Sequence, residues 1–125
     1  MKVKALAHRG YPMKYPENTL SSYKAAHHLG FTHLELDVHL SKDGVPVLMH
    51  DITIDRMTNG KGLVKDYTLA ELRQFRVGEN ETIPTLEEAL LFAKDKMVVS
   101  VELKQQGNLY SGLEESVLQV IQETE

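Results

Sequence analysis

Residues 33–40, with the sequence HLELDVHL, alternate polar and apolar side chains without interruption. Successive side chains of a β-strand point to opposite faces, so this period of two predicts a strand with one polar and one apolar face. The polar face holds His33, Glu35, Asp37 and His39, and the apolar face holds Leu34, Leu36, Val38 and Leu40. Two carboxylates on one face repel each other unless water or a cation lies between them. The face is therefore either simply solvated or part of a cation site.

Helices and strands are expected to alternate along the rest of the chain. Asn18 or Thr19 can cap the start of a helix that ends at Gly30. Two later helix starts show the capping-box pattern of threonine followed three residues on by glutamate, at Thr68 with Glu71 and at Thr85 with Glu88. Strands are expected at 2–7, 33–40, 45–49 and 97–103, and helices at 20–29, 69–75, 86–93 and 114–122. Residues 41–44 carry a turn signal, the strand at 97–103 is expected to be buried, and residues 107–111 are expected to form a loop. Such alternation predicts an α/β fold built on a parallel sheet.

Composition narrows the class of protein. A chain of 125 residues has the length of one domain, and its 14 basic and 18 acidic residues give a net charge of −4, which disfavours nucleic acid as a partner. The absence of cysteine excludes disulfides and thiolate metal sites and fits a reducing cytoplasm. No apolar run approaches the roughly 20 residues of a membrane span. The short apolar stretch before His8 is interrupted too early for a signal peptide, so a mature, cytoplasmic N-terminus is expected.

Polar side chains stand where each expected strand ends. In parallel α/β folds the carboxyl ends of the strands bind ligands, so these side chains are expected to converge. They are His8 and Arg9, then Glu35 and Asp37, then His50 and Asp51, then Glu102 and Lys104. Asp51 either orients an imidazole or caps a turn. His27, His28 and His33 are not expected to form a metal site, and His39 is expected at the rim of the pocket.

These residue types suit one kind of chemistry. Three carboxylates provide oxygen ligands for a hard cation such as Mg²⁺ or Ca²⁺. Arg9 and Lys104 can hold a phosphate, and the alternative is that they only form ion pairs with the acids. Two histidines can serve as general acid and general base near neutral pH. A cation, two basic side chains and an acid–base pair together favour phosphodiester cleavage, in which negative charge grows on phosphoryl oxygens.

An ordered set of motifs identifies a resemblance. The motifs span nearly the whole chain, as AHRG at 7–10, PENT at 16–19, ELDV at 35–38 (reading from Glu35), KDGVPV at 42–47, HD at 50–51, DRMTNG at 55–60, IPTLEE at 83–88 and ELK at 102–104. In this order they resemble the glycerophosphodiester phosphodiesterase family. No single motif is specific, whereas the ordered set is.

The resemblance implies a (βα)₈ TIM barrel that hydrolyses glycerophosphodiesters to an alcohol and sn-glycerol 3-phosphate with a divalent cation, Mg²⁺ or Ca²⁺. It also implies a role for each matching residue. His8 and His50 become the acid–base pair, Glu35, Asp37 and Glu102 the metal ligands, Arg9 and Lys104 the phosphate contacts, and Glu17 a supporting residue. The family mechanism uses the glycerol hydroxyl as internal nucleophile and passes through a cyclic phosphate that water opens.

The chain is shorter than the barrel that the resemblance implies. A barrel of this type needs about 250 residues, whereas residues 1–125 are expected to be a single domain that supplies the first four strand–helix units, the N-terminal half. An open half-barrel exposes sheet edges and an apolar inner surface. Self-association or a complementary half-barrel would cover them. The alternative function is a non-catalytic fragment or assembly module that binds metal or a partner without turnover. A membrane-acting phospholipase of C or D type is disfavoured, because no basic amphipathic helix is evident.

Overall fold

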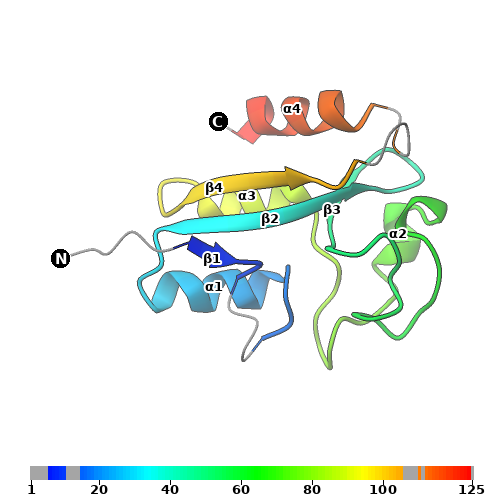
Figure 1. Ribbon diagram of the computed structural model, residues 1–125, viewed down its shortest axis with the longest axis horizontal. Helices are drawn as coiled ribbons and strands as arrows, with labels where there is room; N and C mark the ends of the chain where they lie inside the picture. Colours follow the sequence, from blue (N-terminus) through cyan, green and yellow to red (C-terminus); the bar gives the residue numbers. More distant parts are fainter. Residues whose placement is uncertain (1–5, 11–14, 106–109, 111, 125) are drawn as a thin grey trace.

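The computed structural model describes residues 6–10, 15–105, 110 and 112–124. Of residues 6–8 it describes the backbone alone. The chain forms one mixed sheet with helices packed against it (Figure 1). In chain order the elements are β1 (Leu6–His8), α1 (Leu20–His28), β2 (His33–Leu40), β3 (Pro46–Leu48), the short 3₁₀ helix η1 (Val64–Asp66), α2 (Leu69–Leu72), α3 (Leu86–Ala93), β4 (Val98–Leu103) and α4 (Leu113–Thr124).

The strand with the alternating sequence, β2, lies at the centre of the sheet. It pairs in parallel with β1, where His8 lies opposite Glu35, and in parallel with β4, where Asp37 lies opposite Glu102. Each of these three parallel strands is followed in the chain by a long helix, α1, α3 or α4. The alternation of β2 is confirmed, because its apolar side chains are buried in the main core between the sheet and the helices.

The expectation of a fully parallel sheet was wrong for β3. This strand runs antiparallel to β2, with Leu40 opposite Pro46. Residues 41–45 connect the two strands in a tight turn, in which the Gly44 N–H donates to the Ser41 carbonyl at 3.0 Å. A connection this short permits only an antiparallel pairing. The described residues therefore contain three parallel strand–helix units, and the four that the sequence led us to expect are not confirmed.

Residues 45–83 form a lobe beside the carboxyl end of the sheet, seen around α2 in Figure 1. The lobe has a small core of its own, built from Val47, Met49, Ile54, Val64, Leu72, Val77 and Ile83. Both expected capping boxes are present, Thr68 with Glu71 at α2 and Thr85 with Glu88 at α3. Thr19, rather than Asn18, caps α1, and its hydroxyl accepts from the Ser22 N–H at 3.3 Å. The expected helix at 69–75 ends earlier, at Leu72.

Strand β4 is more exposed than its apolar sequence led us to expect. Its residues alternate between exposed and partly buried, and Val98 keeps 60% of its surface in contact with solvent. Within the described residues β4 pairs with β2 alone, so one of its edges and one of its faces lack a protein neighbour. The polar Glu102 stands on that open face, in register with the carboxylate strand β2. None of the helices in the described segments has both the length and the apolar character needed to cross a membrane.

Candidate active site

Three carboxylates meet where β2 and β4 pair. Glu35 and Asp37 lie two residues apart on one face of β2, and Glu102 is the register partner of Asp37 on β4. Each of the three residues offers an oxygen, and these oxygens all lie within 4.8 Å of one another. Asp37 is fully buried and Glu35 is 8% exposed, whereas Glu102 faces solvent. The parallel pairing of two strands therefore assembles the carboxylate set that the sequence predicts.

Asp37 is held by neighbours from three segments of the chain. The Asn18 Nδ2 donates to Asp37 Oδ2 at 3.0 Å, and the Tyr23 hydroxyl on α1 donates to Asn18 Oδ1 at 2.9 Å. The Arg9 Nε lies 3.4 Å from Asp37 Oδ2, and the Lys104 Nζ lies 3.6 Å from Asp37 Oδ1. Asn18 holds a left-handed backbone conformation with φ of 55°, which asparagine tolerates better than most residues. This orientation turns the amide toward Asp37 instead of toward the helix start.

The close approach of the carboxylates changes their protonation. Burial, together with the charges and hydrogen bonds of Asp37 and Glu102, raises the pKa of Glu35 to about 8. A hydrogen bond from Lys104, supported by hydrogen bonds within the acid cluster, lowers the pKa of Glu102 to about 2. Near neutral pH the site thus holds negative charge on Glu102 and a proton on Glu35.

The carboxylate set fits a hard divalent cation. Asp37 Oδ1 is buried and receives no hydrogen bond from the described residues, and the Lys104 Nζ lies 3.6 Å from it, so this oxygen keeps the capacity to bind a cation. Burial beside two further carboxyl groups raises the pKa of Glu35, so added positive charge would favour its ionised form. A divalent cation supplies that charge, and carboxylate oxygens are the ligands that Mg²⁺ and Ca²⁺ prefer. Glu35, Asp37 and Glu102 are the residues that would hold it.

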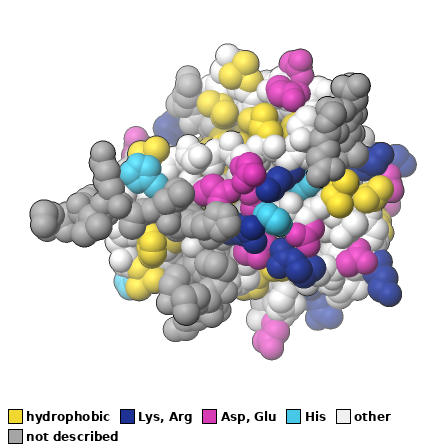
Figure 2. All heavy atoms as spheres, in the orientation of Figure 1, with side chains coloured by type: hydrophobic (Ala, Val, Ile, Leu, Met, Phe, Trp, Pro, Cys, Tyr) yellow, Lys and Arg dark blue, Asp and Glu magenta, His cyan; other side chains and the backbone are white. Residues whose placement is uncertain are grey.

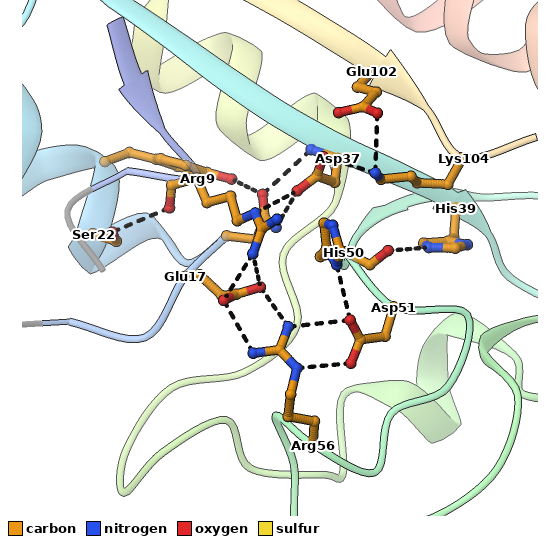
Figure 3. Close-up of polar contacts among 12 residues, drawn as sticks. Arg9, Glu17, Ser22, Asp37, His39, His50, Asp51, Arg56, Glu102 and Lys104 are labelled. Carbon is orange, nitrogen blue, oxygen red and sulfur yellow. Dashed lines mark hydrogen bonds and ion pairs between the residues drawn. The ribbon is translucent and has the colours of Figure 1, made fainter. Parts of the chain in front are cut away.

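Two basic side chains border the carboxylates (Figure 3). The Lys104 Nζ donates to Glu102 Oε1 at 3.0 Å, and the Arg9 Nη1 donates to both carboxylate oxygens of Glu17 at 3.3 Å. Both cations are thus ion-paired with acids while keeping about a fifth of their surface exposed. Glu17 also accepts from Arg56, and these two arginines hold the pKa of Glu17 below its usual value although burial alone would raise it. Figure 2 shows acidic, basic and histidine side chains gathered near the middle of this face.

His50 lines a cavity of about 530 Å³ that opens beside the carboxylates. Its Nδ1 lies 2.9 Å from Asp51 Oδ1, so of the two roles expected for Asp51 the structure shows the contact with the imidazole. Hydrogen bonds from Arg56, outweighing burial, lower the pKa of Asp51 to about 2, so that it is a carboxylate at neutral pH. The other walls of the cavity come from His39, Ile52, Glu102, Leu103, Lys104 and Gln105.

His39 does not lie at the rim, as the sequence led us to expect. It is 2% exposed, its Nε2 lies 3.1 Å from the His50 carbonyl oxygen, and its Nδ1 contacts the Tyr110 hydroxyl. Burial lowers the pKa of His39, so the ring is neutral and hydrogen-bonded on both nitrogens. His39 was misplaced because the strand pattern shows which face a residue occupies and not which loops cover that face.

His8 ends β1 and pairs through its backbone with Glu35, next to the carboxylates. Its side chain lies outside the described part of the structure. Of the other histidines, His27, His28 and His33 belong to no group of potential metal ligands among the described residues. The residues 107–111, expected as a loop, also lie largely outside the described segments.

Sequence reasoning assigned no site role to Asn18 or Arg56, which both reach the site in the structure. Arg56 extends from the 45–83 lobe to Glu17 and Asp51 (Figure 3). Both residues fall inside motifs that carry the family resemblance, PENT and DRMTNG. Those motifs were the available signal, since a loop that approaches the site through space leaves no periodic pattern in the sequence.

Comparisons with known proteins agree with this site. The model of the glycerophosphoryl diester phosphodiesterase family matches residues 8–124. A glycerophosphodiester phosphodiesterase from Caldanaerobacter subterraneus is 44% identical over 131 residues, which cover 98% of this chain and 54% of that protein. The chain spans about half the length of the curated relatives it matches.

Two solved structures show the same fold over nearly all of the chain. Glycerophosphodiester phosphodiesterase from Agrobacterium tumefaciens superimposes with a TM-score of 0.88 at 30% identity, covering 98% of this chain and 53% of that one. A phosphodiesterase from Oleispira antarctica, solved in complex with the product sn-glycerol-3-phosphate, superimposes with a TM-score of 0.84 at 39% identity, covering 98% and 51%. With the family match over residues 8–124, these likenesses show that the chain belongs to the glycerophosphoryl diester phosphodiesterase family.

Proposed function

We propose that this chain carries the metal-binding, phosphate-binding and acid–base residues of an enzyme that hydrolyses glycerophosphodiesters to an alcohol and sn-glycerol 3-phosphate. The observation that carries the proposal is the cluster of Glu35, Asp37 and Glu102, whose oxygens lie within 4.8 Å of one another beside two basic side chains and His50. The product bound in the Oleispira antarctica phosphodiesterase, a 39% identical relative, supports the choice of substrate class. In this proposal residues 1–125 form a single domain, the N-terminal half of a TIM barrel.

Each side chain has a defined task in the proposed reaction. Glu35, Asp37 and Glu102 hold a divalent cation, Mg²⁺ or Ca²⁺, which when bound neutralises charge on the phosphoryl oxygens. Arg9 and Lys104, which border the carboxylates, bind the remaining phosphate oxygens in place of part of their present ion pairs. Glu17 supports Arg9. These groups orient the phosphorus atom and favour the charge that develops during its substitution.

Two histidines move the protons. In the first step one imidazole takes the proton of a glycerol hydroxyl as that oxygen forms a bond to phosphorus, and the other gives a proton to the departing alcohol oxygen. In the second step water attacks the cyclic phosphate, opens the ring and leaves glycerol 3-phosphate, with the proton transfers reversed. His50, which lines the cavity, and His8, at the end of β1, are the two imidazoles. Either can act as acid in a given step, since imidazole can both accept and donate a proton.

The deciding experiment is an assay of glycerol 3-phosphate release from glycerophosphocholine by the purified 125-residue chain. We expect release with Mg²⁺ or Ca²⁺ and loss of release after addition of a chelator. The His50→Ala variant serves as the catalytic control, because it removes an imidazole from the cavity wall and leaves the carboxylates in place. Release that persists in chelator, or in the His50→Ala variant, would contradict the proposed mechanism.

The second candidate is a half-barrel that binds metal or a partner without turnover. The observation that favours it is the open face and edge of β4, where Val98 is 60% exposed and Glu102 faces solvent. Cation binding by calorimetry without any glycerol 3-phosphate release, from a chain shown to be folded, would support this candidate. Sedimentation of the same sample would then show whether the chain self-associates or is a monomer. A monomer would indicate that a complementary half-barrel is needed to complete the fold.

A further inference from the structure

Arg56 lies between two carboxylates that come from opposite sides of the site (Figure 3). Its Nε donates to Asp51 Oδ2 at 2.8 Å and its Nη2 to Asp51 Oδ1 at 3.1 Å. The Nη2 also donates to Glu17 Oε2 at 2.8 Å, and the Nη1 donates to Glu17 Oε1 at 3.2 Å. Two edges of one planar guanidinium thus each hold a carboxylate by a pair of hydrogen bonds, a geometry that lysine cannot reproduce.

Each of the two carboxylates holds a side chain that the proposed reaction uses. Asp51 Oδ1 accepts from the Nδ1 of His50 at 2.9 Å. Glu17 accepts from the Nη1 of Arg9 at 3.3 Å, and Arg9 lies in turn beside Asp37. A continuous line of contacts therefore runs from His50 at the end of β3 to Asp37 on β2, and Arg56 is its central member.

The contact with Asp51 fixes the state of the His50 ring. Asp51 is ionised, so it can only accept a hydrogen bond, and the proton between the two residues must sit on Nδ1. In the neutral ring Nε2 then carries the lone pair and can accept a proton from a substrate. The partner of one ring nitrogen decides which nitrogen is protonated, and here that partner is oriented by Arg56.

The ion pairs of Arg56 are partly buried, so solvent screens them less than it screens ion pairs on the surface. Glu17 is 11% exposed and Asp51 is 26% exposed, while Arg56 itself is about half exposed. Without the guanidinium, two carboxylates would face each other with no cation between them. Asp51 would then turn toward solvent, and His50 would lose the acceptor that holds its ring.

We infer that Arg56 is a positioning residue, which orients His50 through Asp51 and Arg9 through Glu17 and so aligns the two sides of the site. Its side-chain hydrogen bonds go to Asp51 and Glu17 and not to the carboxylate cluster. This inference rests on the proposed function for its catalytic consequence, but the orientation of His50 can be measured without any turnover.

The test compares Arg56→Gln with Arg73→Gln in the full 125-residue chain. Arg73 is a matched control because it is also partly exposed and forms an ion pair, with Glu88. Arg73 caps the end of α2 in the lobe, and Glu88 lies on α3, away from the site. The readout is the tautomer of His50, from the nitrogen chemical shifts of its imidazole above the pH at which the ring loses its charge. In the wild type and in Arg73→Gln we expect the Nδ1–H tautomer alone.

In Arg56→Gln we expect a mixture in which the Nε2–H tautomer is populated, as in Asp51→Ala. Arg56→Lys keeps the positive charge but loses the paired hydrogen bonds to the two carboxylates, so we expect a population of the Nε2–H tautomer between those of the wild type and Arg56→Gln. This variant decides the question if Arg56→Gln does not fold. If the chain turns over glycerophosphocholine, kcat of Arg56→Gln should fall by roughly ten- to a hundredfold, the size typical of residues that orient functional groups. An unchanged His50 tautomer in the folded Arg56 variant would overturn the positioning role and leave the hydrolase proposal untouched.

Discussion

At the scale of single residues, Asn18 shows how one loop side chain prepares a buried carboxylate. Its Nδ2 donates to Asp37 Oδ2 at 3.0 Å, while its Oδ1 accepts from the Tyr23 hydroxyl at 2.9 Å and from the Asp37 N–H at 3.3 Å. The amide is therefore anchored on α1 and on the backbone of β2. The hydrogen bond from Asn18 occupies Asp37 Oδ2 and leaves Oδ1 without a hydrogen bond from the described residues.

Replacing Asn18 with glycine is expected to weaken cation binding. Glycine accepts the φ of 55° without strain, so the change removes the amide alone. We expect the affinity for Mg²⁺, measured by calorimetry, to fall about ten- to a hundredfold, as for other residues that orient metal ligands. The free energy of unfolding should fall by about 1–3 kcal/mol, the cost of a buried hydrogen-bond partner left unmade. Asn59→Gly is the control, because Asn59 Oδ1 also accepts a backbone hydrogen bond, from the Arg76 N–H, far from the carboxylates. Equal affinities in both variants would refute the role of Asn18.

The proton on Glu35 predicts a pH dependence of stability in the metal-free chain. Its pKa is 4.5 in the unfolded chain and about 8 in the folded one, so the folded state holds a proton that the unfolded state has released. This contribution to stability is complete below pH 4.5 and is lost as the pH rises to about 8. The loss is at most about 1.4 kcal/mol per pH unit. The lowered pKa values of Asp51 and Glu102 have the opposite effect, but only in the acid range below the pKa of a free carboxyl.

Urea denaturation across this pH window, in the presence of chelator, measures the effect. In Glu35→Gln, which cannot ionise, the decline in the free energy of unfolding between pH 4.5 and about 8 should disappear. A wild-type chain whose stability does not decline there relative to Glu35→Gln would show that Glu35 ionises normally in the folded state.

At the scale of elements, the junction between β1 and α1 is the tightest contact near the site. Gly10 follows β1 with a φ of 94°, and a Cβ placed on it would lie 2.2 Å from Ser22 Oγ and 2.9 Å from the Ser22 carbonyl carbon on α1. A rotation of the Ser22 side chain would not relieve the second contact. The segment after β1 that bears Arg9 can therefore reach its position beside α1 only because residue 10 lacks a side chain.

Two glycine substitutions separate the free-energy cost of the clash with Ser22 from the cost of the left-handed backbone. Gly44 in the turn between β2 and β3 has a φ of 82° and open space around it, so Gly44→Ala should cost only the left-handed backbone, about 1–2 kcal/mol. Gly10→Ala adds overpacking of about 1–3 kcal/mol to the same strain, so its total loss of unfolding free energy should be clearly larger. Chemical denaturation of both variants checks the difference. Equal losses would mean that α1 moves away from β1 at little cost.

The elements also show what sequence patterns can predict. The alternation of 33–40 and the two capping boxes depend on neighbours within one turn or one strand, and these predictions were confirmed. The direction of β3 was mispredicted although the four-residue turn signal at 41–44 was recognised, because the strand–helix alternation of the whole chain was given more weight than the length of that connection. The burial of β4 was overestimated because burial depends on which elements cover a strand, and sequence alone does not name them.

At the scale of the whole molecule, the site draws on segments that are far apart in the chain. Glu35 and Asp37 were identified from one strand, and Glu102 joins them through the parallel register of β4. Strand ends in a parallel sheet converge by geometry, so the carboxylate cluster was predictable once the strands were. The contacts of Arg56 were not predictable from the sequence, since the lobe at 45–83 folds around a second core and brings this residue to the site through tertiary packing.

Because the three proposed ligands come from two strands, a bound cation should stabilise the entire fold. A ligand that binds only the folded state adds about 2.7 kcal/mol to the free energy of unfolding when present at a hundred times its dissociation constant. We expect Mg²⁺ to raise the Tm of the wild-type chain, with the increase growing as the pH rises through the Glu35 pKa of about 8. Glu102→Gln should remove most of that increase, because it deletes the β4 ligand and weakens the link between β4 and β2. Glu87→Gln, which alters an exposed glutamate in the first turn of α3, should leave the increase intact. An identical Mg²⁺ effect in both variants would mean that the cation binds elsewhere and that the carboxylate cluster is held together by protons and Lys104 alone.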